Sequence, residues 1–261
     1  MDVRARLDTS FEAFRDEIDA ANERRDRMLK VARDVTGLSK KVIFHLHRFR
    51  IADGWPFAGE EHNAGILQEA HGKLEHIYTI LRACALDEGL AGPSDRPSVL
   101  MLRNERNIGG AIEELVEAVS FLYFLEHNAL IPHGVVQDPL RSPTGTLLVY
   151  IAPMRYLLGL SDLTGELMRF GINAASAPAA LFILAQVLGT QQQIYYALER
   201  LVPYYPAVGK KQQVSLASIH KVQDAAYAIR IRSAEYGHDK HLLEAFARRA
   251  AEPQTEEGAC R

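Results

Sequence analysis

The sequence predicts an all-α fold, a single helical bundle of about seven helices. Hydrophobic residues recur every three to four positions over most of the chain, which is the spacing of one face of a helix. Strand-like alternation never extends beyond a few residues, and stretches rich in glycine and proline separate the helical segments. We therefore expect one domain over residues 1–251 and a disordered tail over residues 252–261.

The composition is that of a globular protein. The chain has 261 residues, of which 48% are hydrophobic, and this length can bury a full core. The net charge of −3 gives no whole-chain indication of a nucleic-acid partner. Cys84 and Cys260 lie far apart, which excludes a disulfide framework and suits a reducing compartment. The sequence contains neither an apolar run that could span a membrane nor an apolar signal core, so we expect no secretion.

The first predicted helix is the longest and covers residues 8–50. Its apolar residues follow helical spacing and predict one buried face: Phe11, Phe14, Ile18, Ala21, Met28, Val31, Val35, Val42, Ile43 and Leu46. The middle of the helix is basic, which fits either a solvated face or a stripe that contacts phosphates. Interspersed acidic residues such as Asp19 and Glu23 weaken the second interpretation. A loop over residues 52–60 follows and carries the only tryptophan, Trp55.

The rest of the chain divides at its glycines and prolines. The further helices are predicted at residues 61–85, 99–128, 153–175, 179–201 and 210–235, with a short last helix at 239–250. Residues 89–98 hold two glycines and two prolines and break the chain. Residues 132–145 are expected to form a loop, and a loop of this length in a compact domain is often functional. Pro153 suits the first turn of a helix.

Two pairs of carboxylates stand out within these helices. Asp162 and Glu166 are four residues apart in an otherwise apolar helix, and Glu114 and Glu117 are three apart in an earlier one. Each spacing places both side chains on one helical face. Acidic groups in an apolar environment are costly unless a positive charge or a metal compensates them. If the two helices face each other, the four carboxylates form a hard-oxygen site that suits Mg²⁺ or Mn²⁺.

Other interpretations of these residues remain open at this point. Pairs of glutamates on a helix are commonly just solvated. A ferritin-like di-iron site needs a Glu-x-x-His motif on each of two helices, and this sequence has that spacing only at Glu235 and His238. His45 and His47 point to different sides of a helix, so they are better explained as packing or surface residues than as zinc ligands. A glycine-rich loop for nucleotide triphosphates is missing from the sequence.

Three runs in chain order resemble the translin family, and a fourth run over residues 215–233 resembles it more weakly. They are the segments Arg33–Arg48 (RDVTGLSKKVIFHLHR), Glu114–Phe121 (ELVEAVSF) and Tyr156–Arg169 (YLLGLSDLTGELMR). The resemblance implies a seven-helix domain that joins translin in a hetero-octamer, located in the cytoplasm and the nucleus. It also implies a Mg²⁺-dependent endoribonuclease for single-stranded RNA, acting in RNA silencing and transfer-RNA processing, with DNA as a further ligand.

The resemblance assigns roles to particular residues of this chain. The catalytic and metal-binding carboxylates of the family fall on Glu114, Glu117, Asp162 and Glu166. We expect Glu114 and Asp162 to bind the metal directly, and Glu117 and Glu166 to serve as a further ligand or as the general base in water attack on the phosphodiester. The cations expected to bind the RNA phosphates are Lys40, Lys41 and Arg169. The alternative is a non-catalytic scaffold subunit that stabilises translin and modulates its binding of DNA or RNA.

Overall fold

The structure is a computed structural model that describes residues 3–50, 61–92, 96–177 and 179–236. Within these ranges it contains helices and a single isolated β-bridge, between Arg141 and Leu147, and no strand. This confirms the predicted all-α class. The predicted helix at 239–250, the tail at 252–261 and Trp55 lie outside the described residues. None of the described helices is long and apolar enough to cross a membrane.

Six long helices account for most of the described chain. They are α1 (Val3–Leu46), α2 (Glu61–Asp87), α3 (Val99–His127), α5 (Pro153–Asn173), α6 (Ala180–Glu199) and α7 (Pro206–Tyr236). Short segments complete the order: α4 (His133–Gln137) and the 3-10 turns η1 (Asp138–Leu140) and η2 (Ala174–Ser176). The predicted helix ends agree to within a few residues, although α1 begins and ends several residues earlier than expected.

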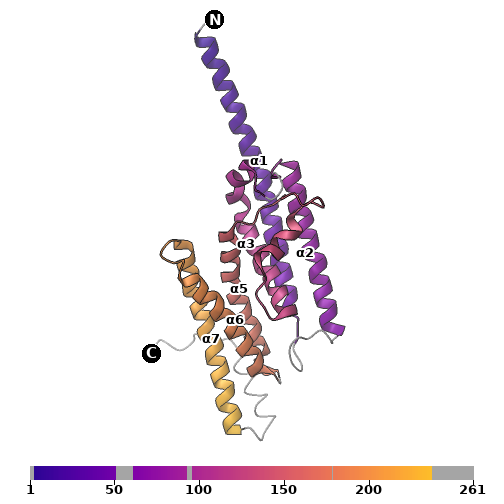
Figure 1. Ribbon diagram of the computed structural model, residues 1–261, viewed down its shortest axis with the longest axis vertical. Helices are drawn as coiled ribbons and strands as arrows, with labels where there is room; N and C mark the ends of the chain where they lie inside the picture. The colour runs from indigo at the N-terminus through magenta and orange to yellow at the C-terminus, as the bar shows by residue number, and fades with distance from the viewer. Residues whose placement is uncertain (1–2, 51–60, 93–95, 178, 237–261) are drawn as a thin grey trace, which may run out of the picture.

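The helices pack as a bundle in which α3 is central. Helix α1 lies against α2 and α3, α3 packs on α5, and α5 packs on α6 and α7 (Figure 1). The core between them holds large, fully buried side chains, including Phe121, Phe124 and Leu115 of α3 and Leu163 of α5. The phenylalanines near the end of α3, Phe121 and Phe124, are therefore core residues.

The segment predicted as a loop at residues 132–145 contains α4 and η1, so that prediction is wrong for its first part. The buried side chain of Gln137 holds this segment in place. Its amide donates to the Val149 carbonyl at 2.7 Å, and its carbonyl accepts from the Ile151 amide at 2.9 Å. His133 contacts the Ile151 carbonyl at 2.9 Å. These long-range bonds order a segment whose proline and glycine content predicts irregular structure.

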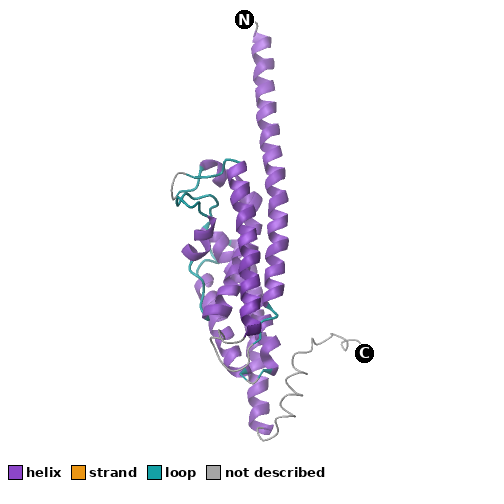
Figure 2. Ribbon diagram, turned by 90° about the vertical axis from the view of Figure 1, so that its right-hand side faces the viewer, coloured by secondary structure: helices purple, strands orange, loops and turns teal. Residues whose placement is uncertain are grey.

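The first half of α1 projects beyond the bundle as an isolated helix (Figure 2). Phe11, Phe14 and Ile18 were predicted to be buried, but each is about 60% exposed, and that prediction is wrong. The first fully buried side chain of α1 is Met28, because the other helices of the bundle extend no farther along it. The seven-residue periodicity of the sequence is the same on both sides of this point, so it could not show where burial begins.

Part of the basic stretch of α1 has a structural role. Arg27 donates to both carboxylate oxygens of Glu88, at 2.5 and 3.0 Å, and Arg24 lies 3.5 Å from the same group. Glu88 follows the last residue of α2 and its side chain is only 7% exposed, so this ion pair joins α1 to α2. The neighbouring Arg25 and Lys30 are exposed, as the solvated-face interpretation expects.

Candidate catalytic site

The site is built on α3 and α5, whose ends are fixed by local sequence. The Ser98 hydroxyl accepts a hydrogen bond from the Met101 amide at 3.0 Å and caps the start of α3. Asn128 ends this helix with a φ of 50°, a conformation that asparagine tolerates better than most residues. Pro153 occupies the first turn of α5, as predicted. Residues outside the site therefore fix both ends of α3 and the start of α5.

Gly159 lets α5 approach α3 closely beside the predicted carboxylates. A Cβ atom at this position would lie 2.7 Å from the Glu113 carbonyl oxygen and 2.7 Å from Cβ of Val116. Neither atom belongs to the flexible end of a side chain, so no residue larger than glycine fits without moving a helix. The contact places the second turn of α5 against the middle of α3.

This packing brings together the four predicted carboxylates, Glu114, Glu117, Asp162 and Glu166, which we call the carboxylate cluster. Burial and, to a lesser extent, the nearby charges of Asp162, Glu114 and Glu166 together raise the pKa of Glu117 to about 8. Among the described residues, Glu117 has neither a hydrogen-bond nor an ion-pair partner. It is the member of the carboxylate cluster whose negative charge is least compensated.

Lys211 of α7 compensates Asp162. Its ammonium group donates to Oδ2 of Asp162, to Oε2 of Glu113 at 3.3 Å and to the Leu158 carbonyl at 3.4 Å. Burial raises the pKa of Asp162, and the hydrogen bond and charge of Lys211 offset only part of this rise. The lysine thus holds Asp162 of α5 and Glu113 of α3 in fixed positions relative to each other.

Arg155 extends this chain of alternating charges away from the carboxylate cluster. Its guanidinium donates to Glu113 at 2.5 Å and to both oxygens of Glu105 at 2.5 and 3.1 Å. The hydrogen bond with Glu105 is the main reason that the pKa of Arg155 is raised. A Cβ at Gly109 would come within 2.4 Å of Cζ of Arg155, so this glycine makes room for the guanidinium. The charges run in order from Glu105 through Arg155, Glu113 and Lys211 to Asp162.

His47, the first residue after α1, compensates Glu166. Its Nε2 atom is hydrogen-bonded to Oε2 of Glu166, and its ring lies 4.9 Å from the ring of Phe121. Burial alone would raise the pKa of Glu166, but the hydrogen bonds and charges of His47 and Arg169 outweigh burial and lower it. The Nδ1 atom of His47 is buried and has no hydrogen-bond partner. The sequence assigned His47 to packing or to the surface, whereas the structure places it in the site.

The predicted phosphate-binding cations lie at the edge of the carboxylate cluster. Lys40 of α1 is 3.4 Å from Glu114, and Arg169 is 3.6 Å from Glu166. Both side chains are more than half exposed, so they remain accessible to a ligand. Lys41 is exposed and makes no ion pair with the described residues. The structure therefore brings two of the three predicted cations to the carboxylate cluster.

The donor chemistry of the carboxylate cluster fits a hard divalent cation, since every donor is a carboxylate oxygen. A cation beside Glu117 would also compensate the crowding that raises its pKa. In the described part of the chain, however, no group of three or more His, Cys, Asp and Glu side chains is arranged to hold a metal ion. Glu114, Asp162 and Glu166 instead contact Lys40, Lys211 and His47, respectively. Binding a cation requires these side chains to turn toward Glu117.

Sequence reasoning missed His47, Glu113, Arg155 and Lys211. A signal existed for His47, because it lies seven residues after Lys40, and a helix continued through residue 47 would place both on one face, two turns apart. Glu113 directly precedes Glu114 but leaves the helix at a different angle. Lys211 comes from a helix far along the chain, and no spacing within the sequence relates it to Asp162.

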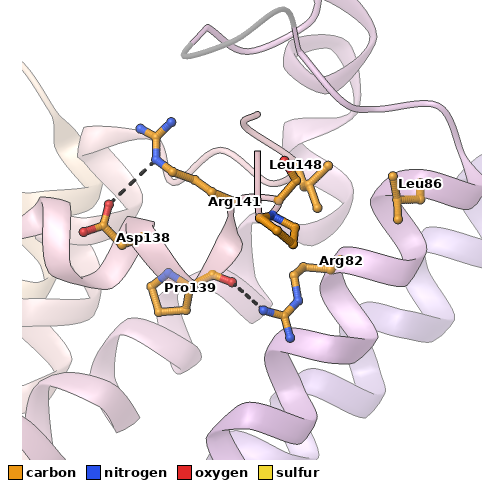
Figure 3. A pocket seen from close by; sticks show the side chains of 8 residues that line it. Arg82, Leu86, Asp138, Pro139, Arg141 and Leu148 are labelled. Atoms are coloured by element: carbon orange, nitrogen blue, oxygen red, sulfur yellow. Dashed lines mark hydrogen bonds and ion pairs between the residues drawn. The ribbon is translucent and has the colours of Figure 1, made fainter. Parts of the chain in front are cut away.

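A surface pocket of about 520 Å³ lies away from the carboxylate cluster, between α2 and the segment that follows η1 (Figure 3). Two arginines line it, but both have partners within the chain. Arg82 donates to the Pro139 carbonyl at 3.1 Å, and Arg141 lies 3.7 Å from Asp138. The Arg82 contact fastens η1 to α2, whereas the ion pair of Arg141 is local to η1 and the residue that follows it. Both arginines that line the pocket therefore have structural roles.

Comparisons with known proteins relate the chain to one family. Residues 23–233 match the model of the Translin family. The chain is 30% identical to Translin-associated protein X of Pongo abelii over 255 residues, which cover 90% of this chain and 81% of the relative. It is 25% identical to the Translin-associated protein X homolog of Schizosaccharomyces pombe over 233 residues, covering 88% and 90% of the two chains.

Solved structures show the same fold. The crystal structure of AfC3PO superposes with a TM-score of 0.58 at 18% identity, covering 85% of this chain and 97% of that one. The crystal structure of apo-NeC3PO superposes with a TM-score of 0.55 at 13% identity, covering 83% and 95%. At these identities the likeness concerns the fold and says nothing further about the site.

Proposed function

The chain belongs to the translin family, and from this premise we propose that it is the catalytic subunit of a translin-containing, Mg²⁺-dependent endoribonuclease that acts on single-stranded RNA. Its relatives are named for their association with translin. The runs of sequence that resemble the family include all four residues of the carboxylate cluster. The proposal thus assigns catalysis to the face where α3 meets α5.

The observation that carries the proposal is the crowding of carboxylates around Glu117. Burial first, and then the charges of three other acidic side chains, raise its pKa, and Glu117 has no hydrogen-bond or ion-pair partner among the described residues. Burying an acidic group is costly unless a positive charge compensates it, and Glu117 is the member of the carboxylate cluster without such a partner in the described part of the chain. A divalent cation is the compensation that this donor set fits best.

The chain's own residues suggest how phosphodiester hydrolysis would proceed. Magnesium bound to the carboxylate cluster would supply a Lewis acid and lower the pKa of the attacking water. Lys40 and Arg169, exposed beside the carboxylate cluster, would bind the phosphate and offset its charge. Glu117 or Glu166 would accept the proton of the attacking water, and the hydrogen bond from His47 would orient Glu166 for that role. Lys211 would keep Asp162 in place on α5.

Cleavage by the assembled complex tests the proposal. The chain is co-assembled with translin and given a labelled single-stranded RNA, with Mg²⁺ or with EDTA. We expect cleavage that needs both translin and Mg²⁺, and a loss of about a hundredfold or more in rate for the double variant Glu114→Ala with Asp162→Ala. Glu126→Gln is the matched control, because this glutamate of α3 pairs with His71 instead and lies outside the carboxylate cluster.

Metal binding gives a second, activity-independent measurement. Because a ligand that binds the folded state stabilises it, Mg²⁺ should raise the melting temperature of the wild-type complex. It should raise that of the double variant much less. A double variant that cuts RNA at the wild-type rate, or that gains as much stability from Mg²⁺, would show that the carboxylate cluster is not the catalytic site.

One observation favours a second candidate, a scaffold subunit that stabilises translin and modulates its binding of nucleic acid. Glu114, Asp162 and Glu166 each have a cationic partner within the chain, as structural ion pairs do. On this alternative the carboxylate cluster joins α1, α3, α5 and α7 and has no part in chemistry. The complex would then retain RNA without cutting it under any metal condition, and the variants would lower stability alone.

A further inference from the structure

One phenylalanine of α1 is exposed in the part of the helix that packs in the bundle. Phe44 is 73% exposed, whereas its neighbours Ile43 and His45 are both buried. A single exposed apolar side chain is ordinary on a protein surface, so exposure by itself assigns Phe44 no role. What makes it a candidate binding residue is where it lies.

Helical spacing places Phe44 between two contacts of the carboxylate cluster. Lys40, four residues earlier, lies 3.4 Å from Glu114, and His47, three residues later, is hydrogen-bonded to Glu166. Positions i, i+4 and i+7 share one face of a helix, and helical hydrogen bonding continues as far as His47. The exposed ring of Phe44 therefore lies beside the carboxylate cluster.

This turn of α1 is fixed by contacts on both sides of Phe44. The His47 amide donates to the Ile43 carbonyl at 3.2 Å, which extends the helical geometry one residue past the end of α1. The His45 side chain contacts the Ile66 carbonyl at 3.1 Å and fastens the turn to α2. Because the backbone is already held, a ligand that binds the ring does not have to order it first.

The charges around Phe44 favour an anionic ligand. Residues 35–50 contain four cations and no acidic residue, and these cations are Lys40, Lys41, Arg48 and Arg50. Lys40 and Lys41 precede Phe44 by four and three residues, so both lie next to it on the helix surface. All four cations are exposed. An aromatic ring interleaved with cations is typical of surfaces that bind single-stranded nucleic acid, where the cations follow the phosphates and the ring stacks on a base.

We propose that Phe44 binds the substrate by stacking on an unpaired base of the RNA, while Lys40 binds the phosphate of the same nucleotide. This inference rests on the proposed function, which brings RNA to the carboxylate cluster. Four helical residues rise by about 6 Å, a step short enough for one nucleotide to reach both side chains. The stacked base thus belongs to a nucleotide beside the bond that is cut.

Stacking on Phe44 gives the site a preference for single strands. In a duplex both faces of each base are covered by the neighbouring bases, so the ring can stack only on a base that is free to turn out of the helix. Every base has a flat face, so the preference carries little dependence on sequence. Phe44 is therefore a specificity-determining residue, and the carboxylate cluster does not itself distinguish a single strand from a duplex.

Fluorescence tests the stacking directly and needs no cleavage. The variant Phe44→Trp is co-assembled with translin in EDTA, and its emission is compared with that of the wild-type complex as a short oligo-uridine is added to saturation. We expect more quenching in the variant, because a stacked base quenches the fluorescence of an indole ring. An abasic strand of the same length and charge, also at saturation, should give no excess quenching. Equal quenching of variant and wild type by oligo-uridine, or equal excess quenching by the abasic strand, would overturn the proposal.

Cleavage kinetics test whether the flat ring is what matters. Phe44→Leu stays apolar but cannot stack, so its KM for oligo-uridine should rise about tenfold with kcat nearly unchanged, whereas Phe44→Trp should keep the wild-type KM. Phe182→Leu is the matched control, because Phe182 is an exposed phenylalanine of α6, which contributes nothing to the carboxylate cluster. The rise in melting temperature with Mg²⁺ should be the same in all these complexes.

The two measurements separate this inference from the proposed function. A wild-type complex that does not cut RNA contradicts the proposed function, and the fluorescence experiment still decides whether a base stacks on Phe44. A wild-type KM in Phe44→Leu would overturn the stacking and leave the catalytic role of the carboxylate cluster untouched. A Phe44→Leu chain that no longer assembles with translin, as size-exclusion chromatography would show, would make Phe44 a subunit contact and overturn the proposal as well.

Discussion

Glu117 shows at the scale of one residue how the site differs from an ordinary salt-bridge network. Its neighbours in the carboxylate cluster have Lys40, Lys211 and His47 as partners, whereas Glu117 is half-buried among negative charges. Its pKa of about 8 exceeds the 4.5 of an ordinary glutamate. Between these two pH values the folded chain holds a proton that the unfolded chain has lost. The free energy of unfolding should therefore fall as the pH rises from about 4.5 to about 8, and then level off.

Glu117→Gln removes the titrating group and should abolish that part of the pH dependence. We expect the variant to match the wild type near pH 4.5 and to exceed its stability by about 2–4 kcal/mol above pH 8. Urea unfolding in EDTA at several pH values measures this difference, with Glu126→Gln as the control. A wild-type stability that is flat over this range would contradict a crowded, uncompensated Glu117.

Lys211 is a positive charge that offsets the negative charges of the site. It donates to Asp162 and Glu113 and lowers the pKa of Glu117. Lys211→Met leaves both carboxylates without their shared partner, so we expect the free energy of unfolding at pH 8 to fall by about 2 kcal/mol or more. Lys210→Met is the matched control, because Lys210 precedes Lys211 in the chain but is exposed. Thermal and urea unfolding compare the two variants, and an equal, small loss for both would show that Lys211 is not holding the helices together.

Helix α5 shows at the scale of one element which part of the site the sequence can predict. The four-residue spacing of Asp162 and Glu166 fixes their common face, and the three-residue spacing of Glu114 and Glu117 fixes another. Periodicity states which residues share a face but not which helix that face meets. The contact at Gly159 and the partners His47 and Lys211 depend on packing between elements far apart in the chain, so only the structure reveals them.

Gly159→Ala tests the close contact of α5 with α3. The added Cβ would press on the Glu113 carbonyl and on Val116, so one helix must move. We expect a loss of about 1–3 kcal/mol in the free energy of unfolding, together with weaker Mg²⁺ stabilisation, since the carboxylate cluster spans the two helices. Gly165→Ala, one turn and a half along the same helix, meets no atom within 4 Å and should stabilise by about 0.5–1 kcal/mol. Chemical unfolding of both variants checks the contrast, and equal effects would refute the close contact.

Helix α1 shows where prediction from the sequence reaches its limit. Its length and apolar face were predicted nearly as the structure has them, but Phe11, Phe14 and Ile18 proved exposed. The same seven-residue pattern occurs on a helix face that is buried within its own chain and on a face that only another chain could cover. The sequence thus identifies an apolar helix face, but it does not show whether that face is buried by the same chain.

At the scale of the whole molecule, the chain divides into a bundle that carries its own core and a projecting arm, residues 7–23 of α1, whose side chains are all exposed. Burial along α1 begins at Met28, and the ion pairs of Arg24 and Arg27 with Glu88 lie on the bundle side of the arm. Catalysis would belong to the bundle, where α1, α3, α5 and α7 meet. The arm can therefore be cut from the chain without removing any part of that site.

A chain that begins at Glu23 makes this cut and keeps both arginines that pair with Glu88. Because the removed residues pack on no described part of the bundle, we expect the truncated chain to retain the melting temperature of a dilute wild-type sample and its response to Mg²⁺. Scanning calorimetry of the two chains, with Mg²⁺ and with EDTA, measures both quantities. A lower melting temperature for the truncated chain at every concentration would mean that the arm supports the bundle directly, and the division of the molecule into two independent parts would be wrong.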